Sequence, residues 1–182
     1  MKNKKTVVKF ESHGLLVLQE ALHKLHEGKY HIQVGIFGGK TARKKGEVTN
    51  AEVGYVHERG SRMRNIPQRS FLWDTFSEHG QEWMDAVQGD VLKLYKTGKI
   101  PEFLKRAGLF AENLVQKAFD TGGFGKWAPL SLGTLMAKAK GNVFKRMQQA
   151  AEDLYGGGHN VAILVKTGQL RRAIASRTAG GA

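Results

Sequence analysis

The sequence predicts an α+β fold: one domain in which a small, mostly antiparallel sheet of two to four strands packs with about six helices. Three observations lead to this class. Residues 30–37 alternate apolar and polar side chains, which is the pattern of a strand with one buried face. Longer stretches carry apolar residues at helical spacing, with glycine or proline at their ends. Strands and helices do not alternate regularly, so a doubly wound parallel sheet is not expected.

The first third of the chain is predicted to hold two strands and two helices. We expect a strand over 5–10, a helix over 13–27, a strand over 30–37 and a helix over 50–59. Ser12 and Asn50 are the expected N-caps, and Gly28 and Gly60 are the expected stops. The first helix is expected to bury a stripe of four leucines, Leu15, Leu18, Leu22 and Leu25.

The remainder is predicted to be mainly helical. A helix broken at Gly80 is expected over 69–97, and a second helix runs from Pro101 to about 119. Its buried stripe is expected to be Phe103, Ala107, Phe110, Leu114 and Ala118. After a glycine hinge at 122–125, a turn at 127–130 precedes a helix capped by Ser131 and ended by glycines 156–158. A short strand over 161–165 and a last helix to 175, capped by Thr167, complete the prediction, with mobile ends at about 1–4 and 177–182.

Composition narrows the class of protein. The 182 residues include 41% hydrophobic and 25% charged side chains, which are ordinary values for a folded domain. The absence of cysteine excludes disulfides and thiolate metal sites. The basic N-terminus lacks the apolar core of a signal peptide, and no window approaches the roughly 18 apolar residues of a membrane span. We therefore expect no membrane partner.

The net charge of +13 indicates either a solvated basic surface or proximity to a polyanion, with nucleic acid favoured over an anionic membrane. The basic residues form four clusters: Lys40, Arg43, Lys44 and Lys45; Arg59, Arg62, Arg64 and Arg69; Lys138, Lys140, Lys145 and Arg146; and Arg171, Arg172 and Arg177. None matches a helix-turn-helix or basic-zipper pattern, so any contact with nucleic acid would be to phosphates and without sequence readout. Arginines at an interface between subunits are an equal alternative.

Candidate enzyme motifs are incomplete. Gly39-Lys40-Thr41 lacks the first glycine of a phosphate-binding loop, because Val34 stands at that position. His57-Glu58 lacks the second histidine of a zinc-protease helix, because Ser61 stands there. His23 and His26 have no further ligand at metal-binding spacing. Four carboxylates stand at ordinary surface spacing on a helix: Asp74, Glu78, Asp85 and Asp90. We predict no catalytic residue, no cofactor and no metal.

Three blocks of residues carry a resemblance to a known family. The first runs from Ala51 to Leu72 and has the form A-x-x-[AG]-x-x-H-E-x-G … I-P-x-R-x-F-L. The second is W-x-P-L-S-x-x-T from Trp127 to Thr134, and the third, over 165–174, contains T-G-x-L-R. Together they resemble the neck, tail-completion and virion morphogenesis proteins of tailed bacteriophages. The residues that carry the resemblance are His57, Glu58, Gly60, Pro67, Arg69, Phe71, Trp127, Pro129, Leu130, Thr167, Gly168 and Leu170.

The resemblance implies a structural virion protein rather than an enzyme. Such proteins form a homo-oligomeric ring, sixfold or twelvefold, at the head–tail junction, and are assembled in the host cytoplasm. Their partners are the connector or adaptor on one side and the tail terminator or tail tube on the other. Packaged DNA lies nearby, and the possible assembly or DNA-proximal basic patch is Lys40, Arg43, Lys44, Lys45, Arg62 and Arg64.

The chain departs from the family pattern at two positions. Gly54 stands where alanine is usual, and Ser70 stands where proline is frequent. The alternative function is a basic module that binds nucleic acid without sequence preference, for which the charge of +13 is the main indication.

Overall fold

The computed structural model describes residues 12–27, 30–38, 48–139, 141–155, 164 and 168–180. The elements in chain order are α1 (Ser12–His26), β1 (Tyr30–Ile36), α2 (Asn50–Arg59), α3 (Trp73–Thr97), α4 (Ile100–Asp120), α5 (Leu132–Lys138), α6 (Val143–Tyr155), α7 (Gln169–Ala173) and β2 (Ile174–Gly180). This part of the chain therefore holds seven helices and one two-stranded antiparallel sheet, which confirms the predicted α+β class.

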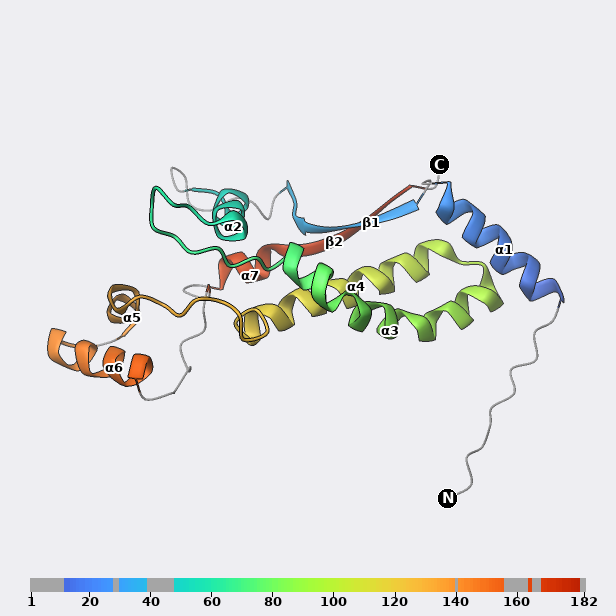
Figure 1. Ribbon diagram of the computed structural model, residues 1–182. Coiled ribbons are helices and arrows are strands. Elements are labelled where there is room, and N and C mark those ends of the chain that lie inside the picture. The colour runs from blue at the N-terminus through green and yellow to red at the C-terminus, as the bar shows by residue number, and fades with distance from the viewer. Residues whose placement is uncertain are drawn as a thin grey trace, which may run out of the picture.

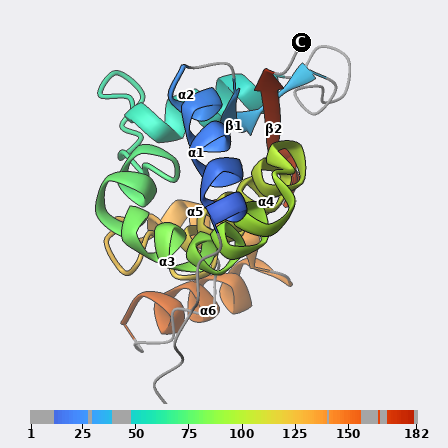
Figure 2. The same ribbon diagram turned by 90° about the vertical axis from the view of Figure 1, so that its right-hand side faces the viewer.

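Helix α4 is the central element of the fold (Figure 1). It packs against α3 as an antiparallel hairpin and contacts both strands, so it lies between the sheet and α3. Gly108 permits the close approach of α4 to the sheet, since a Cβ there would lie 2.6 Å from Oγ of Ser176. Helix α1 packs on α3 and reaches β1, as the turned view shows (Figure 2), while α5 and α6 pack mainly against each other.

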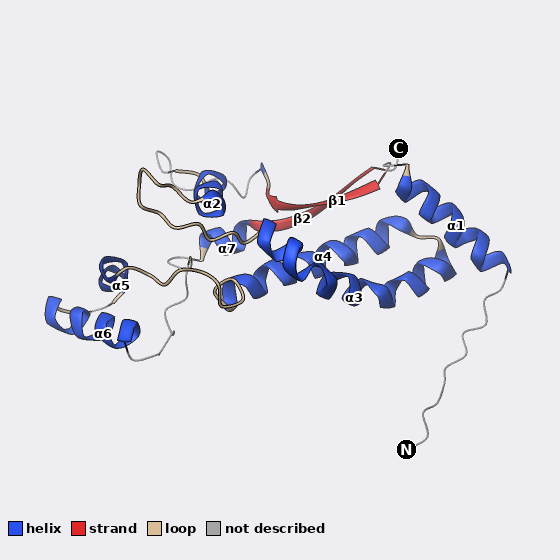
Figure 3. Ribbon diagram, in the orientation of Figure 1, coloured by secondary structure: helices blue, strands red, loops and turns tan. Residues whose placement is uncertain are grey.

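The sheet pairs β1, near the start of the described chain, with β2 at its end. Strand β1 was predicted from its alternation, and its register with β2 runs from Tyr30 opposite Gly180 to Ile36 opposite Ile174. The expectation that a helix continues to residue 175 and that a mobile tail follows was wrong, because 174–180 form β2 (Figure 3). The local sequence of this strand is small and polar. It becomes a strand because its backbone groups pair with β1, which is more than a hundred residues away in the sequence.

Two apolar clusters form the core. The first, at the α7 end of α4, consists of Phe71, Val115, Ala118, Phe119, Trp127, Leu170 and Ile174. The second, where α1 covers the α3–α4 turn, consists of Ala21, Leu94, Ile100 and Leu104. Strand β1 serves both clusters, as its alternation predicted: Val34 and Ile36 pack on the first, and Tyr30 and Ile32 pack on the second.

Helix α1 buries a different stripe from the one predicted. Ala21 is buried and Leu18 and Leu25 are partly buried, whereas Leu15 and Leu22 are about half exposed. The contact begins at Gly14, where a Cβ would lie 2.2 Å from the ring of Tyr95. The helix is therefore rotated so that its small residues face α3.

Helix α2 spans the predicted residues, but the prediction that Asn50 is its N-cap was wrong. Thr49 is its N-cap, and with Glu52 it forms a reciprocal capping box, while Asn50 is the first helical residue and is buried. The Thr-x-x-Glu spacing was a readable signal for this cap.

Helices α3 and α4 also correct the prediction. Helix α3 runs unbroken from Trp73 through Gly80, so the predicted break was wrong; an isolated glycine costs a helix only about 1 kcal/mol. Pro101 stands in the first turn of α4 as predicted. The predicted stripe of α4 is displaced, because Phe103 and Phe110 are only half buried and these other residues complete the buried face: Leu104, Ala111, Val115 and Phe119.

Other expectations concern helix ends and undescribed segments. Ser131 caps α5 as predicted, by accepting a hydrogen bond from the amide of Thr134. Several predicted features lie outside the described residues: the strand over 5–10, the stop at Gly28, the basic cluster from Lys40 to Lys45, the glycines 156–158 and the Thr167 cap. Of the predicted strand over 161–165 only Leu164 is described, and it lies in a turn. No helix among the described residues is long and apolar enough to cross a membrane.

Phe71 and Trp73 offer a direct test of this core. Phe71 is 1% exposed and Trp73, two residues on, is 76% exposed. We predict that Phe71→Ala lowers the free energy of unfolding by about 3–5 kcal/mol, because it leaves a cavity in the first cluster. Trp73→Ala should change it by no more than about 0.5 kcal/mol. Urea denaturation of both variants measures this, and equal destabilisation by the two would contradict the assigned core.

Candidate functional site

The carboxylate of Glu58 binds the start of α3. Oε2 accepts hydrogen bonds from the backbone amides of Phe71 (2.9 Å) and Leu72 (3.1 Å). Oε1 accepts from Oγ of Ser70 (2.6 Å) and from the amide of Trp73 (2.9 Å). Amides at a helix start have no partner within the helix and carry partial positive charge, so an anion there is strongly stabilising. One side chain of α2 thus caps a different helix.

Ser70 links this cap to its surroundings. Its Oγ donates to Glu58 and accepts from the amide of Asp74 (3.0 Å), and its carbonyl oxygen accepts from Nε1 of Trp127 (3.2 Å). Proline, which the resembling family often has here, carries no hydroxyl to make the first two bonds. The serine therefore adds polar contacts to α3 that were not predicted from the sequence.

Arg69 connects the first and second sequence blocks. Its backbone amide donates to the carbonyl of His57 (2.7 Å). Its buried guanidinium donates from Nε (3.2 Å) and Nη2 (3.0 Å) to the carbonyl of Ala128, and from Nη2 to that of Pro129 (3.2 Å). Burial lowers the pKa of Arg69. The positive charge is held by backbone dipoles rather than by a carboxylate.

The third sequence block joins the same core cluster through Leu170, which packs with three aromatic residues. The Phe119 ring lies 5.1 Å from Phe71 and 5.7 Å, edge to face, from Trp127, and Leu170 of α7 belongs to the same cluster. Gly54 of α2 sits against this cluster, where a Cβ would lie 2.9 Å from Cδ1 of Ile36. An alanine here would require the end of the Ile36 side chain to shift.

Gly60 and the loop after it shape one wall of a cleft. Gly60 ends α2 with φ of 72°, and a Cβ there would lie 2.9 Å from the backbone nitrogen of Gln68. Both the backbone conformation and the close backbone contact therefore require glycine. Ser61 and Ile66 exchange two backbone hydrogen bonds of 2.8 and 2.9 Å, which close the loop that carries Arg62 and Arg64.

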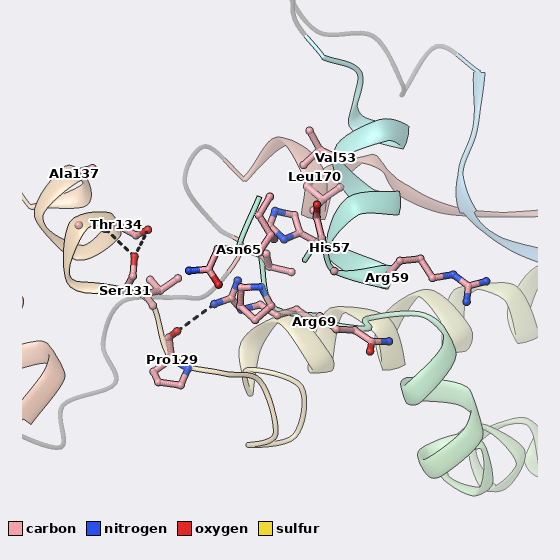
Figure 4. A pocket seen from close by; sticks show the side chains of 18 of the residues that line it. Val53, His57, Arg59, Asn65, Arg69, Pro129, Ser131, Thr134, Ala137 and Leu170 are labelled. Carbon is pink, nitrogen blue, oxygen red and sulfur yellow. Dashed lines mark hydrogen bonds between the residues drawn. The ribbon is translucent and has the colours of Figure 1, made fainter. Parts of the chain in front are cut away.

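The cleft between this loop, α5 and α7 has a volume of about 1980 Å³ (Figure 4). His57, Arg69, Pro129 and Leu130 all line it. Nδ1 of His57 is buried and has no hydrogen-bond partner among the described residues. Burial, and secondly the charge of Arg69, lower the pKa of His57 and so favour its neutral imidazole.

Most of the residues singled out in the sequence meet at this place. Glu58, Arg69, Phe71, Trp127 and Leu170 lie in or on the first core cluster. Gly168, with φ of 69°, precedes α7. Gly168 and the exposed Pro67 both line the cleft. Arg62 and Arg64 are exposed on the loop. The structure does not describe Thr167 or the four cations Lys40, Arg43, Lys44 and Lys45.

The described residues contain no group of three or more His, Cys, Asp or Glu side chains that could hold a metal ion. Both oxygens of Glu58 are engaged by the start of α3. Asp90 was expected on the surface but is only 5% exposed. It accepts a hydrogen bond from Nε of Arg106 (2.8 Å), which with Lys93 holds its pKa below the ordinary value.

Comparison with known proteins identifies no relative: no family model, no curated protein and no solved structure matches the chain. Function must therefore be argued from the residues and their geometry.

Glu58 is the side chain on which we expect the site to depend most. Glu58→Ala should lower the free energy of unfolding by about 2–4 kcal/mol, because it leaves three backbone amides and the Ser70 hydroxyl without their acceptor. Glu58→Gln should cost less, since the amide oxygen still accepts. Glu102→Ala is the matched control, because Glu102 is exposed and its one ion pair within the described part of the chain is with Lys99 (3.1 Å). Urea denaturation should show the control within about 0.5 kcal/mol of the parent; a similarly small effect for Glu58→Ala would contradict the assigned role.

Proposed function

We propose that this chain is a structural subunit of a phage neck, which forms a ring at the head–tail junction and has no catalytic role. One observation carries the proposal. The three sequence blocks that resemble the neck and tail-completion family are spread over 51–174, yet their residues meet around a single core cluster. A fold built from these three blocks would place their apolar residues around one core, and Phe71, Trp127 and Leu170 lie in one cluster here.

The contacts within this cluster support a scaffold rather than an active site. Glu58 and Arg69, its two charged residues, are held by backbone groups. A side chain with its hydrogen bonds satisfied in this way is poorly suited to transfer protons. It is well suited to fix α2, α3 and the turn at 127–130 relative to one another.

Exposed apolar side chains support assembly. Trp73 is 76% exposed and Met63, on the loop after α2, is fully exposed. A second hollow of about 690 Å³ lies beside Trp73 and is lined in part by Val34, Leu72 and Phe76. Ring subunits contact one another through two different surfaces, and large exposed apolar residues mark such contacts. The flanking partners would be a connector or adaptor and a tail terminator or tail tube protein, within the virion.

A nucleic-acid-binding module remains the second candidate. Arg59, Arg62 and Arg64 are exposed, and within the described part of the chain they form no ion pair. Together with the charge of +13, they would bind phosphates without reading sequence.

Negative-stain imaging of the purified protein, alone and with isolated tails, tests the proposal. We expect rings, or density that caps the tail end that meets the head. Trp73→Glu should abolish the rings but leave the monomer folded, with an unchanged far-UV circular dichroism spectrum, because the residue is 76% exposed in the single chain. Lys105→Gln is the control, because it lowers the net charge by the same single unit at another exposed position of the surface.

A protein that stays monomeric and does not bind isolated tails would contradict the neck assignment. If that monomer also shifted duplex DNA on a gel, with affinity falling steeply as salt rises, the second candidate would replace the first.

A further inference from the structure

The large cleft beside α2 has an unusual charge pattern. Among the described residues that line it there is no aspartate or glutamate, whereas three are arginines: Arg59, Arg62 and Arg69. Arg59 and Arg62 are exposed and make no ion pair with the described residues. Arg69 adds a buried charge, since its hydrogen bonds go to carbonyl oxygens of Ala128 and Pro129. The cleft is therefore positively charged and without an internal counter-ion in this part of the chain.

The rest of the lining is apolar with a few hydrogen-bonding groups. The apolar part consists mainly of Val53, Ile66, Pro67, Leu130 and Leu170. Ser131 and Asn65 add polar groups, as Figure 4 shows, and Nδ1 of His57 is buried without a partner among the described residues. An apolar surface with a small number of polar and charged groups is the usual form of a site that binds an extended segment or small ligand.

The lining favours a peptide over nucleic acid. No phenylalanine, tyrosine or tryptophan is among the described lining residues, so the cleft offers no aromatic ring on which bases could stack. Apolar side chains of a peptide, in contrast, would bury well against the leucine, valine and proline surface.

We propose that this cleft binds an acidic segment of a different protein, with carboxylates at Arg59 and Arg62 and apolar side chains on the floor. The chain itself is a poor source of such a segment. Its 16 acidic residues are dispersed, and Glu152-Asp153 is the only adjacent pair. At a net charge of +13, a second copy would also bring a like charge to the cleft. The inference rests on the cleft alone and does not require a ring.

Fluorescence anisotropy tests this with a short fluorescein-labelled peptide in which glutamate alternates with leucine and serine. The comparison peptide has glutamine in place of each glutamate. At about 0.15 M salt, where long-range attraction is screened, we expect the glutamate peptide to bind at least about tenfold more tightly. Equal affinity for the two peptides, or no binding of either, would overturn the proposal.

Three variants separate the cleft from general charge attraction. Arg59→Gln/Arg62→Gln should weaken binding by about tenfold or more. Lys96→Gln/Lys105→Gln removes the same charge from two exposed lysines at the other end of α3 and α4, and should leave binding nearly unchanged. Gly133→Leu adds bulk to the cleft without changing charge, at a site where a Cβ meets nothing within 4 Å, and should also weaken binding.

Two results would contradict the assignment to the cleft. Equal loss of affinity in the two double variants would show that only net charge matters. Tighter binding of a duplex DNA oligonucleotide than of the glutamate peptide, lost in the Arg59→Gln/Arg62→Gln variant, would assign the cleft to nucleic acid. Neither result depends on whether the protein forms rings, so failure here is distinct from failure of the neck assignment.

Discussion

The hydrogen bonds from the start of α3 to Glu58 hold together much of what surrounds the cleft. Glu58 accepts from three backbone amides and from Ser70, which fixes α2 against α3. That geometry places Phe71 in the core and Arg69 within reach of the carbonyls at 128 and 129. The turn that carries Trp127 is thereby joined to the same cluster. The wall of the cleft formed by Gly60 and the following loop is supported by this one interaction between helices.

Local signals in the sequence predicted local structure well. The alternation of β1, the glycine that ends α2, the proline in the first turn of α4 and the cap of α5 each depend on a few neighbouring residues. Strand β2 could not be predicted in the same way, because its residues form a strand only when paired with β1. The break at Gly80 was wrong for a related reason: packing along α3 outweighs the weak preference of one glycine.

The candidate site was only partly visible in the sequence. Short motifs included Glu58, Arg69 and Trp127, but the hydrogen bonds of these residues connect positions 12 to 60 apart in the sequence and follow from the fold alone. The role of Ser70 was missed, since it appeared only as a departure from a pattern. The cleft itself could not be predicted from the sequence. Its arginines come from one segment of the chain, but its leucines and prolines come from three segments that only the fold brings together. The structure thus adds contacts to a set of residues that the sequence had already selected.

Native-state hydrogen exchange, followed by NMR, tests the central claim most directly. If Glu58 holds the start of α3, the amides of Phe71, Leu72 and Trp73 should exchange only with global unfolding. Trp73 is the sharpest case, because its side chain is exposed while its amide is bound. The amide of Met63, in the exposed loop, supplies the fast reference. Exchange of the Trp73 amide as fast as that of Met63 would show that the Glu58 interaction does not hold α3 in place.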